Sequence, residues 1–252
     1  MELPTPTLSP LDYRYCSLRI AETEILVGDE EPSRFIHQSD GCIEVSAGGA
    51  TPVLVGSFSS LVIDVESVIT EGVHPFDVFD TFSKTAPYYQ SLYLQRSWSG
   101  ADFRKTVFKA VFGDESAWRP NLLILDRLEV FPEHRGHQVG IAALRGLIER
   151  FRMGTGLIVM KPYPLQFESE PVRPEDIEYR KQLGLDNFRM GFKPLAKLRG
   201  YYSSLGFRLI PRTSLMGLAP EHYIVWLDRC RMAAITTPAL FILAATVAAC
   251  PH

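Results

Sequence analysis

Cysteine is scarce in this chain of 252 residues, and the spacing of its four cysteines excludes several classes of protein. No Cys-x-x-Cys pair occurs among Cys16, Cys42, Cys230 and Cys250, so the sequence indicates neither a zinc knuckle nor a small disulfide-stapled scaffold. There is no Asn-x-Ser/Thr sequon, and the first residues lack the basic and apolar regions of a secretory signal. We therefore expect a cytoplasmic protein, because free thiols persist in reducing compartments.

An excess of charge of either sign is also absent. Lys and Arg number 26 against 29 Asp and Glu, which gives a formal net charge of -3. A general nucleic-acid binder usually carries a basic face, so we expect no nucleic-acid partner. The balance still allows a local basic pocket for an anionic ligand.

Long apolar runs are absent except at residues 233–250, which carry no charge. Pro238 interrupts this run and leaves an apolar stretch of about 12 residues, whose helix would span roughly 18 Å, less than the ~30 Å hydrocarbon core. We expect a docked terminal helix or a partner contact. A disordered or non-native tail and a membrane anchor are the alternatives, and the membrane is the less favoured partner.

Apolar periodicity divides the chain into an extension at residues 1–40 that could hold a first strand, an α/β domain at 41–232 and an apolar tail at 233–252. Hydrophobic residues make up 46% of the chain, enough for a sizeable core. Residues 41–65 predict a hairpin that turns at Gly48 and Gly49, and residues 74–95 predict one or two helices. A strand at 121–130, a helix at 136–151 and a buried strand near 155–164 follow.

The rest of the domain continues this alternation. A polar insertion at residues 165–191 predicts a loop with a short helix, and residues 193–206 predict an amphipathic helix that ends at Gly206. Two short strands, "FRLIP" at 207–211 and "HYIVWLD" at 222–228, close it. Strands that alternate with helices in the second half indicate an α/β architecture.

The segment "RGHQVG", residues 135–140, lies where the predicted strand passes into the predicted helix. A helix N-terminus offers unpaired N–H groups and partial positive charge, and glycines let a ligand approach the backbone. Arg135 adds a charge-assisted donor. The chain has neither a Gly-Lys dipeptide nor Gly-x-Gly-x-x-Gly, so a Walker A loop and a dinucleotide fingerprint are absent. The segment is a candidate phosphate loop; a helix start that needs glycine for close packing is the alternative.

Two patterns in order resemble the GCN5-related N-acetyltransferase superfamily. "RGHQVG" after a strand and Pro132 is similar to its acetyl-CoA loop, Arg/Gln-x-x-Gly-x-Gly/Ala, and "YYSSLGF" at 201–207 is similar to its late Tyr-x-x-x-Gly-Phe segment. The match covers roughly residues 121–228. It implies a mixed, mostly antiparallel central sheet flanked by helices, with a parallel strand pair that splays apart at the acyl-CoA site.

The resemblance also implies an activity: acetyl-CoA as cosubstrate, and transfer of its acetyl group to an amine that attacks the thioester directly. The strand end, Leu128 to Val130, would pair with the pantetheine amides, and the next strand would turn away near Met160. Tyr202 would protonate or orient the leaving thiolate. The pyrophosphate would be held by the backbone N–H groups of Arg135, Gly136, His137, Gln138, Val139 and Gly140.

Two positions depart from the family pattern or leave a choice open. Gln138 stands where the family usually has its first glycine, and it brings a Cβ and a long side chain toward the pyrophosphate. Gln can stay helical with its side chain turned outward, so the loop could keep its form; the affinity for CoA is the property that Gln138 would change. Tyr201 and Tyr202 are adjacent; the motif spacing favours Tyr202 at the thiol, and core packing is the alternative for both.

The catalytic base has two candidates on the central strand, Asp126 and Glu129, which strict alternation puts on opposite sides unless a bulge intervenes. Glu129 is nearer the expected acetyl site. A structural partnership of Glu129 with Arg127 or Arg145, or a relayed water as the base, is the alternative.

The acceptor amine, a small molecule or a protein, is left open, as is a homodimer. Asp77 and Asp80, with His74 before them, could line a cationic acceptor pocket or form a solvated helix face. His134 and His137 indicate an exposed loop rather than a metal site. The competing function is a non-catalytic module of the same fold that binds acyl-CoA or a partner protein.

Overall fold

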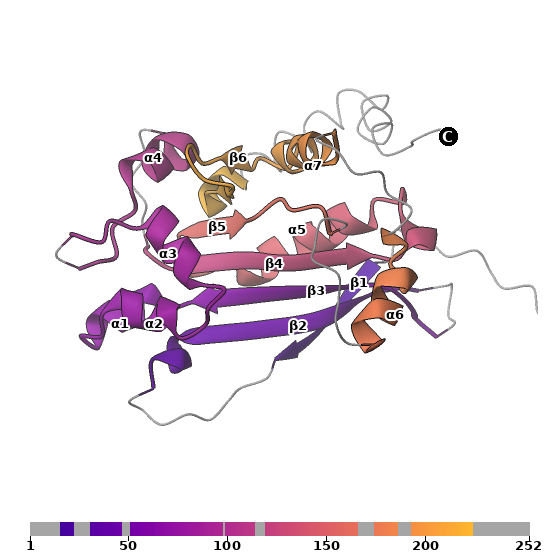
Figure 1. Ribbon diagram of the computed structural model, residues 1–252, viewed down its shortest axis with the longest axis horizontal. Helices are drawn as coiled ribbons and strands as arrows, with labels where there is room; N and C mark the ends of the chain where they lie inside the picture. Colours follow the sequence, from indigo (N-terminus) through magenta and orange to yellow (C-terminus); the bar gives the residue numbers. More distant parts are fainter. Residues whose placement is uncertain are drawn as a thin grey trace, which may run out of the picture.

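The computed structural model describes residues 16–22, 31–46, 51–97, 99–113, 119–165, 174–185 and 193–223 (Figure 1). Within these ranges the chain forms one seven-stranded sheet in the order β1-β2-β3-β4-β5-β7-β6. The sheet is antiparallel except between β4 and β5, which run parallel. The predicted α/β class with a mixed, mostly antiparallel sheet is confirmed. The apolar tail and the turn at Gly48 and Gly49 lie outside the described residues.

The N-terminal half of the sheet is a meander. Strand β1 (Cys16–Glu22) pairs with β2 (Ile36–Val45), and β2 pairs with β3 (Val53–Ile63) as the predicted hairpin. A short 3-10 helix, η1 (Pro32–Phe35), leads into β2. The domain boundary expected at residue 40 therefore falls inside β2, and the first strand belongs to the same sheet as the rest.

In the described part of the connection between β3 and β4 lie four short helices: α1 (Val65–Thr70), α2 (Pro75–Asp80), α3 (Ala86–Leu92) and α4 (Lys105–Val107), which continues into the π-helical turn η2 (Phe108–Phe112). Two of them, α2 and α3, are the helices predicted between residues 74 and 95. The polar face of α2 agrees with the solvated alternative, because Asp77 and Asp80 are exposed. His74 caps α2 by accepting a hydrogen bond at Nδ1 from the Phe76 N–H, at 3.2 Å.

The second half follows the predicted alternation. Strand β4 (Leu122–Val130) and the 3-10 turn η3 (Pro132–His134) precede α5 (Val139–Phe151), β5 (Leu157–Met160), α6 (Pro174–Gln182), α7 (Lys193–Ser203) and β6 (Arg208–Leu209). The last strand, β7 (Met216–Leu218), was not predicted. Residues 222 and 223, predicted to begin a strand, instead belong to a helical turn that starts at Pro220, and residues 224–228 of that predicted strand lie outside the described residues. Proline is favoured at the first position of a helix, and the strand prediction followed the apolar pattern of 222–228 instead of that signal.

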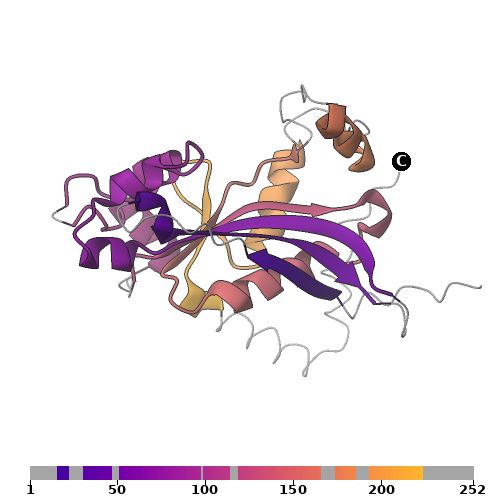
Figure 2. The same cartoon turned by 90° about the horizontal axis from the view of Figure 1, so that it is seen from below.

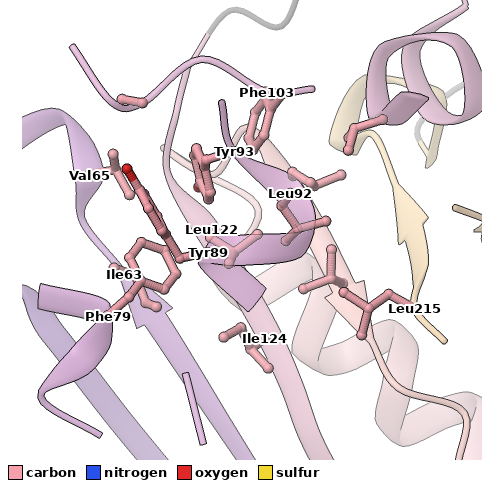
Figure 3. Close-up of a cluster of buried hydrophobic side chains, with 14 of the residues drawn as sticks. Ile63, Val65, Phe79, Tyr89, Leu92, Tyr93, Phe103, Leu122, Ile124 and Leu215 are labelled. Atoms are coloured by element: carbon pink, nitrogen blue, oxygen red, sulfur yellow. The ribbon is translucent and has the colours of Figure 1, made fainter. Parts of the chain in front are cut away.

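The two faces of β4 pack against different helices. Leu122 and Ile124 join an aromatic cluster with α1 to α4, in which Tyr89 and Tyr93 stack at 5.5 Å between ring centroids (Figure 3). Leu123 and Leu125 pack on the other face, with α5. In Figure 2, α5 and α6 lie on opposite faces of the sheet. Both faces of β4 are therefore covered by helices, and side chains of β4 contribute to a cluster on each face.

Gly56 fixes how closely β3 approaches the end of β4. A Cβ at this position would lie 2.1 Å from the Glu129 carbonyl oxygen, a backbone atom that cannot move alone. We expect Gly56→Ala to lower the free energy of unfolding by at least about 2 kcal/mol, measured by urea denaturation. Gly200→Ala is the control: nothing lies within 4 Å of its added Cβ in α7, so stability should rise by about 0.5–1 kcal/mol.

Candidate functional site

The parallel pairing of β4 with β5 ends before β4 does. Their register runs from Leu122 opposite Leu157 to Leu125 opposite Met160. Strand β5 stops at Met160, whereas β4 continues to Val130. In the described ranges no strand pairs with this side of β4 beyond Leu125. The end of β4 therefore presents a strand edge at which an extended ligand could add backbone hydrogen bonds.

A β-bulge at Asp126 changes which side chains face which layer. Ser59 of β3 lies opposite Arg127 and Ser60 lies opposite Leu125, so Asp126 has no partner on β3. An extra residue reverses the alternation beyond it. Leu128 and Val130 consequently join the α5 cluster, and Arg127 and Glu129 point to the opposite face.

The bulge also answers the question about the two candidate bases. The Asp126 carboxylate accepts a hydrogen bond at 3.0 Å from Nζ of Lys84, which lies between α2 and α3. Asp126 and Glu129 are thus both directed to the face away from α5. Strict alternation would put them on opposite sides, but the bulge that was the alternative is present, and Asp126 is its extra residue.

Glu129 is the most enclosed charged group of the site, with 2% of its surface exposed. The Arg127 Nε–H donates to Oε1, and the hydroxyls of Ser57 and Tyr179 both donate to Oε2, the serine at 2.8 Å. These two hydroxyl oxygens are 3.1 Å apart. Burial and the hydrogen bond to Glu129 raise the pKa of Tyr179, so its hydroxyl is protonated at neutral pH. A structural ion pair of Glu129 with Arg127 was one of the alternatives to a role as catalytic base, and this ion pair is present.

Sequence reasoning missed Ser57 and Tyr179. The register of the predicted hairpin offered a signal for Ser57, because β3 places it directly opposite Glu129. No signal pointed to Tyr179, which α6 brings in from the polar insertion.

The loop from η3 to α5 contains two residues with positive φ. Gln138 has φ 62° and ψ 11°, the left-handed region, and Gly136 has φ 83°. Gln138 does not stay helical: it is the residue before the helix, and α5 begins at Val139, three residues after the predicted start at 136. The Gln138 side chain makes no capping hydrogen bond to the first turn. A residue without a Cβ would adopt this conformation at lower cost.

The Arg135 guanidinium donates hydrogen bonds to two backbone carbonyls of the protein. Its Nε–H donates to the Val130 carbonyl at 2.9 Å, and Nη2 donates to the Leu183 carbonyl at 2.7 Å. Burial lowers its pKa from the usual arginine value. The side chain thereby ties the loop to the end of β4 and to the residues that follow α6.

The two histidines of the loop differ in exposure. His137 is exposed as expected, but His134 is buried, with 8% of its surface exposed. His134 ends the 3-10 turn η3, and its backbone N–H donates to the Phe131 carbonyl at 3.0 Å. Among the described residues no group of three His, Cys, Asp or Glu side chains could hold a metal ion.

The adjacent tyrosines of α7 both join the cluster that contains Leu128 and Val130. The Tyr201 hydroxyl lies 3.0 Å from where a Cβ on Gly140 would stand, at the start of α5. The Tyr202 ring packs edge-on against Phe207, with centroids 6.3 Å apart, and burial raises its pKa to about 12. Tyr201 thus reaches toward the loop helix, while Phe207 holds the ring of Tyr202.

Comparison with protein-family models, with curated proteins and with solved structures finds no match to this chain. No helix in the described ranges is both long enough and apolar enough to cross a bilayer.

Gln138→Gly tests the strained loop directly. Glycine removes the left-handed penalty, so we expect the free energy of unfolding to rise by about 1 kcal/mol. We also expect tighter CoA binding, because the backbone can be approached more closely. Denaturation and calorimetry measure the two effects.

Arg212→Gly is the matched control, since Arg212 is the other described non-glycine residue with positive φ, at 65°. It should gain stability and leave CoA affinity unchanged. Equal effects of both variants on CoA affinity would contradict a role for the loop backbone.

Proposed function

We propose that this protein is an acetyl-CoA-dependent N-acetyltransferase that moves the acetyl group to an amine by direct attack on the thioester. The observation that carries the proposal is the β4–loop–α5–β5 unit. A parallel strand pair stops at Leu125 and Met160, β4 runs on with an edge that pairs with no strand of the described residues, and a left-handed turn at Gln138 precedes α5. This combination suits a ligand that has an anionic group and an extended amide-bearing arm.

The loop backbone from Arg135 to Gly140 would hold the pyrophosphate, as the α5 N-terminus is a site of partial positive charge without a side-chain cap from Gln138. Arg135 contributes by fixing the loop through its carbonyl contacts rather than by a free charge. The edge at Leu128 and Val130 would bind the pantetheine amides, alongside the hydrogen bond that the Val130 carbonyl already accepts from Arg135. Acetyl-CoA would supply the activated acyl group.

The chemistry would draw on both faces of β4. Glu129 is directed away from α5, where the amine would lose its proton, and Tyr202 packs in the α5 cluster with Leu128. A tyrosine with a pKa of about 12 is a weaker acid than one with the usual value near 10. We therefore assign Tyr202 a hydrogen bond that stabilises the departing thiolate, the second of the two roles that the motif allows.

Titration calorimetry with acetyl-CoA and a thiol-release assay with polyamines, amino acids and lysine-containing peptides test the proposal. Binding and turnover with at least one amine support it. Binding without turnover identifies the non-catalytic acyl-CoA module instead, and no binding at millimolar acetyl-CoA removes both. The same panel decides whether the acceptor is a small molecule or a peptide.

A further inference from the structure

The carboxylate of Glu129 cannot meet an acceptor amine without help. Its side chain is 1% exposed, and both oxygens already accept hydrogen bonds from Arg127, Ser57 and Tyr179. The two hydroxyl residues are themselves only partly buried. A base this enclosed must therefore either lose one of its donors or receive its proton through one of them.

We infer that Tyr179 and Ser57 are the residues through which the acceptor amine passes its proton to Glu129, an inference that rests on the proposed acetyltransferase function. The ammonium N–H would donate to the Tyr179 hydroxyl oxygen as the Tyr179 O–H proton moves to Oε2 of Glu129. The amine becomes neutral, Tyr179 keeps one proton, and Glu129 becomes a carboxylic acid. The carboxylic acid returns the proton to solvent by the reverse route after the product leaves.

The chemistry of the three donors singles out the hydroxyls. A hydroxyl donates and accepts at once, so it can exchange one proton for another, whereas a guanidinium has no acceptor and stays charged. Ser57 and Tyr179 share Oε2, and 3.1 Å separates their oxygens, so either can reach the carboxylate or the other. Arg127 instead neutralises Glu129 from the other oxygen.

The position of Tyr179 does not depend on its hydrogen bond alone. Leu183 and Leu185, just after α6, pack against Phe131 in a small cluster that also takes in the Tyr179 ring. Arg135 holds the Leu183 carbonyl at 2.7 Å. Removing the Tyr179 hydroxyl should therefore leave α6 docked, and this permits a test by conservative substitution.

The test compares two acceptors in Tyr179→Phe, Ser57→Ala and the double variant. One acceptor is the alkylamine from the panel that the unaltered protein acetylates fastest, which is protonated at pH 7. The other is hydroxylamine, which is largely neutral there and needs no proton removed before attack. We expect kcat with the alkylamine to fall about 10- to 100-fold in Tyr179→Phe and further in the double variant. With hydroxylamine it should stay within about threefold.

Ser59→Ala is the matched control. Ser59 is half-buried on the same face of β3, two residues from Ser57, and lies opposite Arg127 rather than Glu129. It should leave both rates unchanged. Equal losses with both acceptors, or no loss with the alkylamine, would overturn the relay and leave the acetyltransferase proposal standing. Failure of the unaltered protein to release CoA with any amine would remove both.

Discussion

Glu129→Gln is expected to lower kcat for amine acetylation by about 10²- to 10⁴-fold, the range that a lost general base usually costs. The amide matches the carboxylate in size, and its oxygen can still accept the hydroxyls of Ser57 and Tyr179. Its NH2 group then faces the Arg127 Nε–H donor, so some stability should be lost, and urea denaturation measures how much. The amide cannot take up a proton. Acetyl-CoA affinity should be nearly unchanged, because Glu129 points away from the face that carries α5. Steady-state thiol release and calorimetry measure the two quantities.

Asp126→Asn is the control that separates the two candidate bases. Asp126 lies on the bulge and forms a salt bridge with Lys84; the Asp126 side chain is 30% exposed and the Lys84 side chain 41%. Such pairs contribute little, so we expect a loss of no more than about 1 kcal/mol in stability and little change in kcat. A larger loss of kcat in Asp126→Asn than in Glu129→Gln would exchange the roles of the two residues.

The sequence predicts most of the sheet because its strands are short, dense apolar runs with clear interruptions. Strand β4 and helix α5 were both placed within a few residues, since the pattern changes from a continuous run to helical spacing on either side of Pro132. Strand β7 was missed because three buried residues are too short a pattern to distinguish from a loop.

The site is less visible than the fold, for two physical reasons. The extra residue Asp126 carries no sequence signal, yet it decides which face every later side chain of β4 occupies. The contacts of Tyr179 with Ser57 and Glu129 join positions 122 and 50 residues apart, which no local pattern encodes. Gln138 is a third case: the motif marked it as standing where glycine is usual, but the left-handed backbone at that position was not predicted.

Tyr202→Phe is expected to lower kcat by about 10- to 100-fold while acetyl-CoA affinity is retained, if its hydroxyl stabilises the leaving thiolate. The ring would keep its edge-on contact with Phe207, so stability should change little. Because burial raises its pKa to about 12, the phenol should stay protonated in the assay range. The kcat profile of the unaltered protein should accordingly show no loss from its ionisation below about pH 11.

Tyr201→Phe decides whether the motif spacing has selected the correct one of two adjacent tyrosines. The Tyr201 hydroxyl lies against the start of α5 near Gly140, so its removal should affect acetyl-CoA affinity more than kcat. Tyr202 should show the reverse, with the loss confined to kcat. If Tyr201→Phe instead carries the larger loss of kcat, the hydroxyl nearest the loop helix serves the thiolate, and Tyr202 is a packing residue held by Phe207.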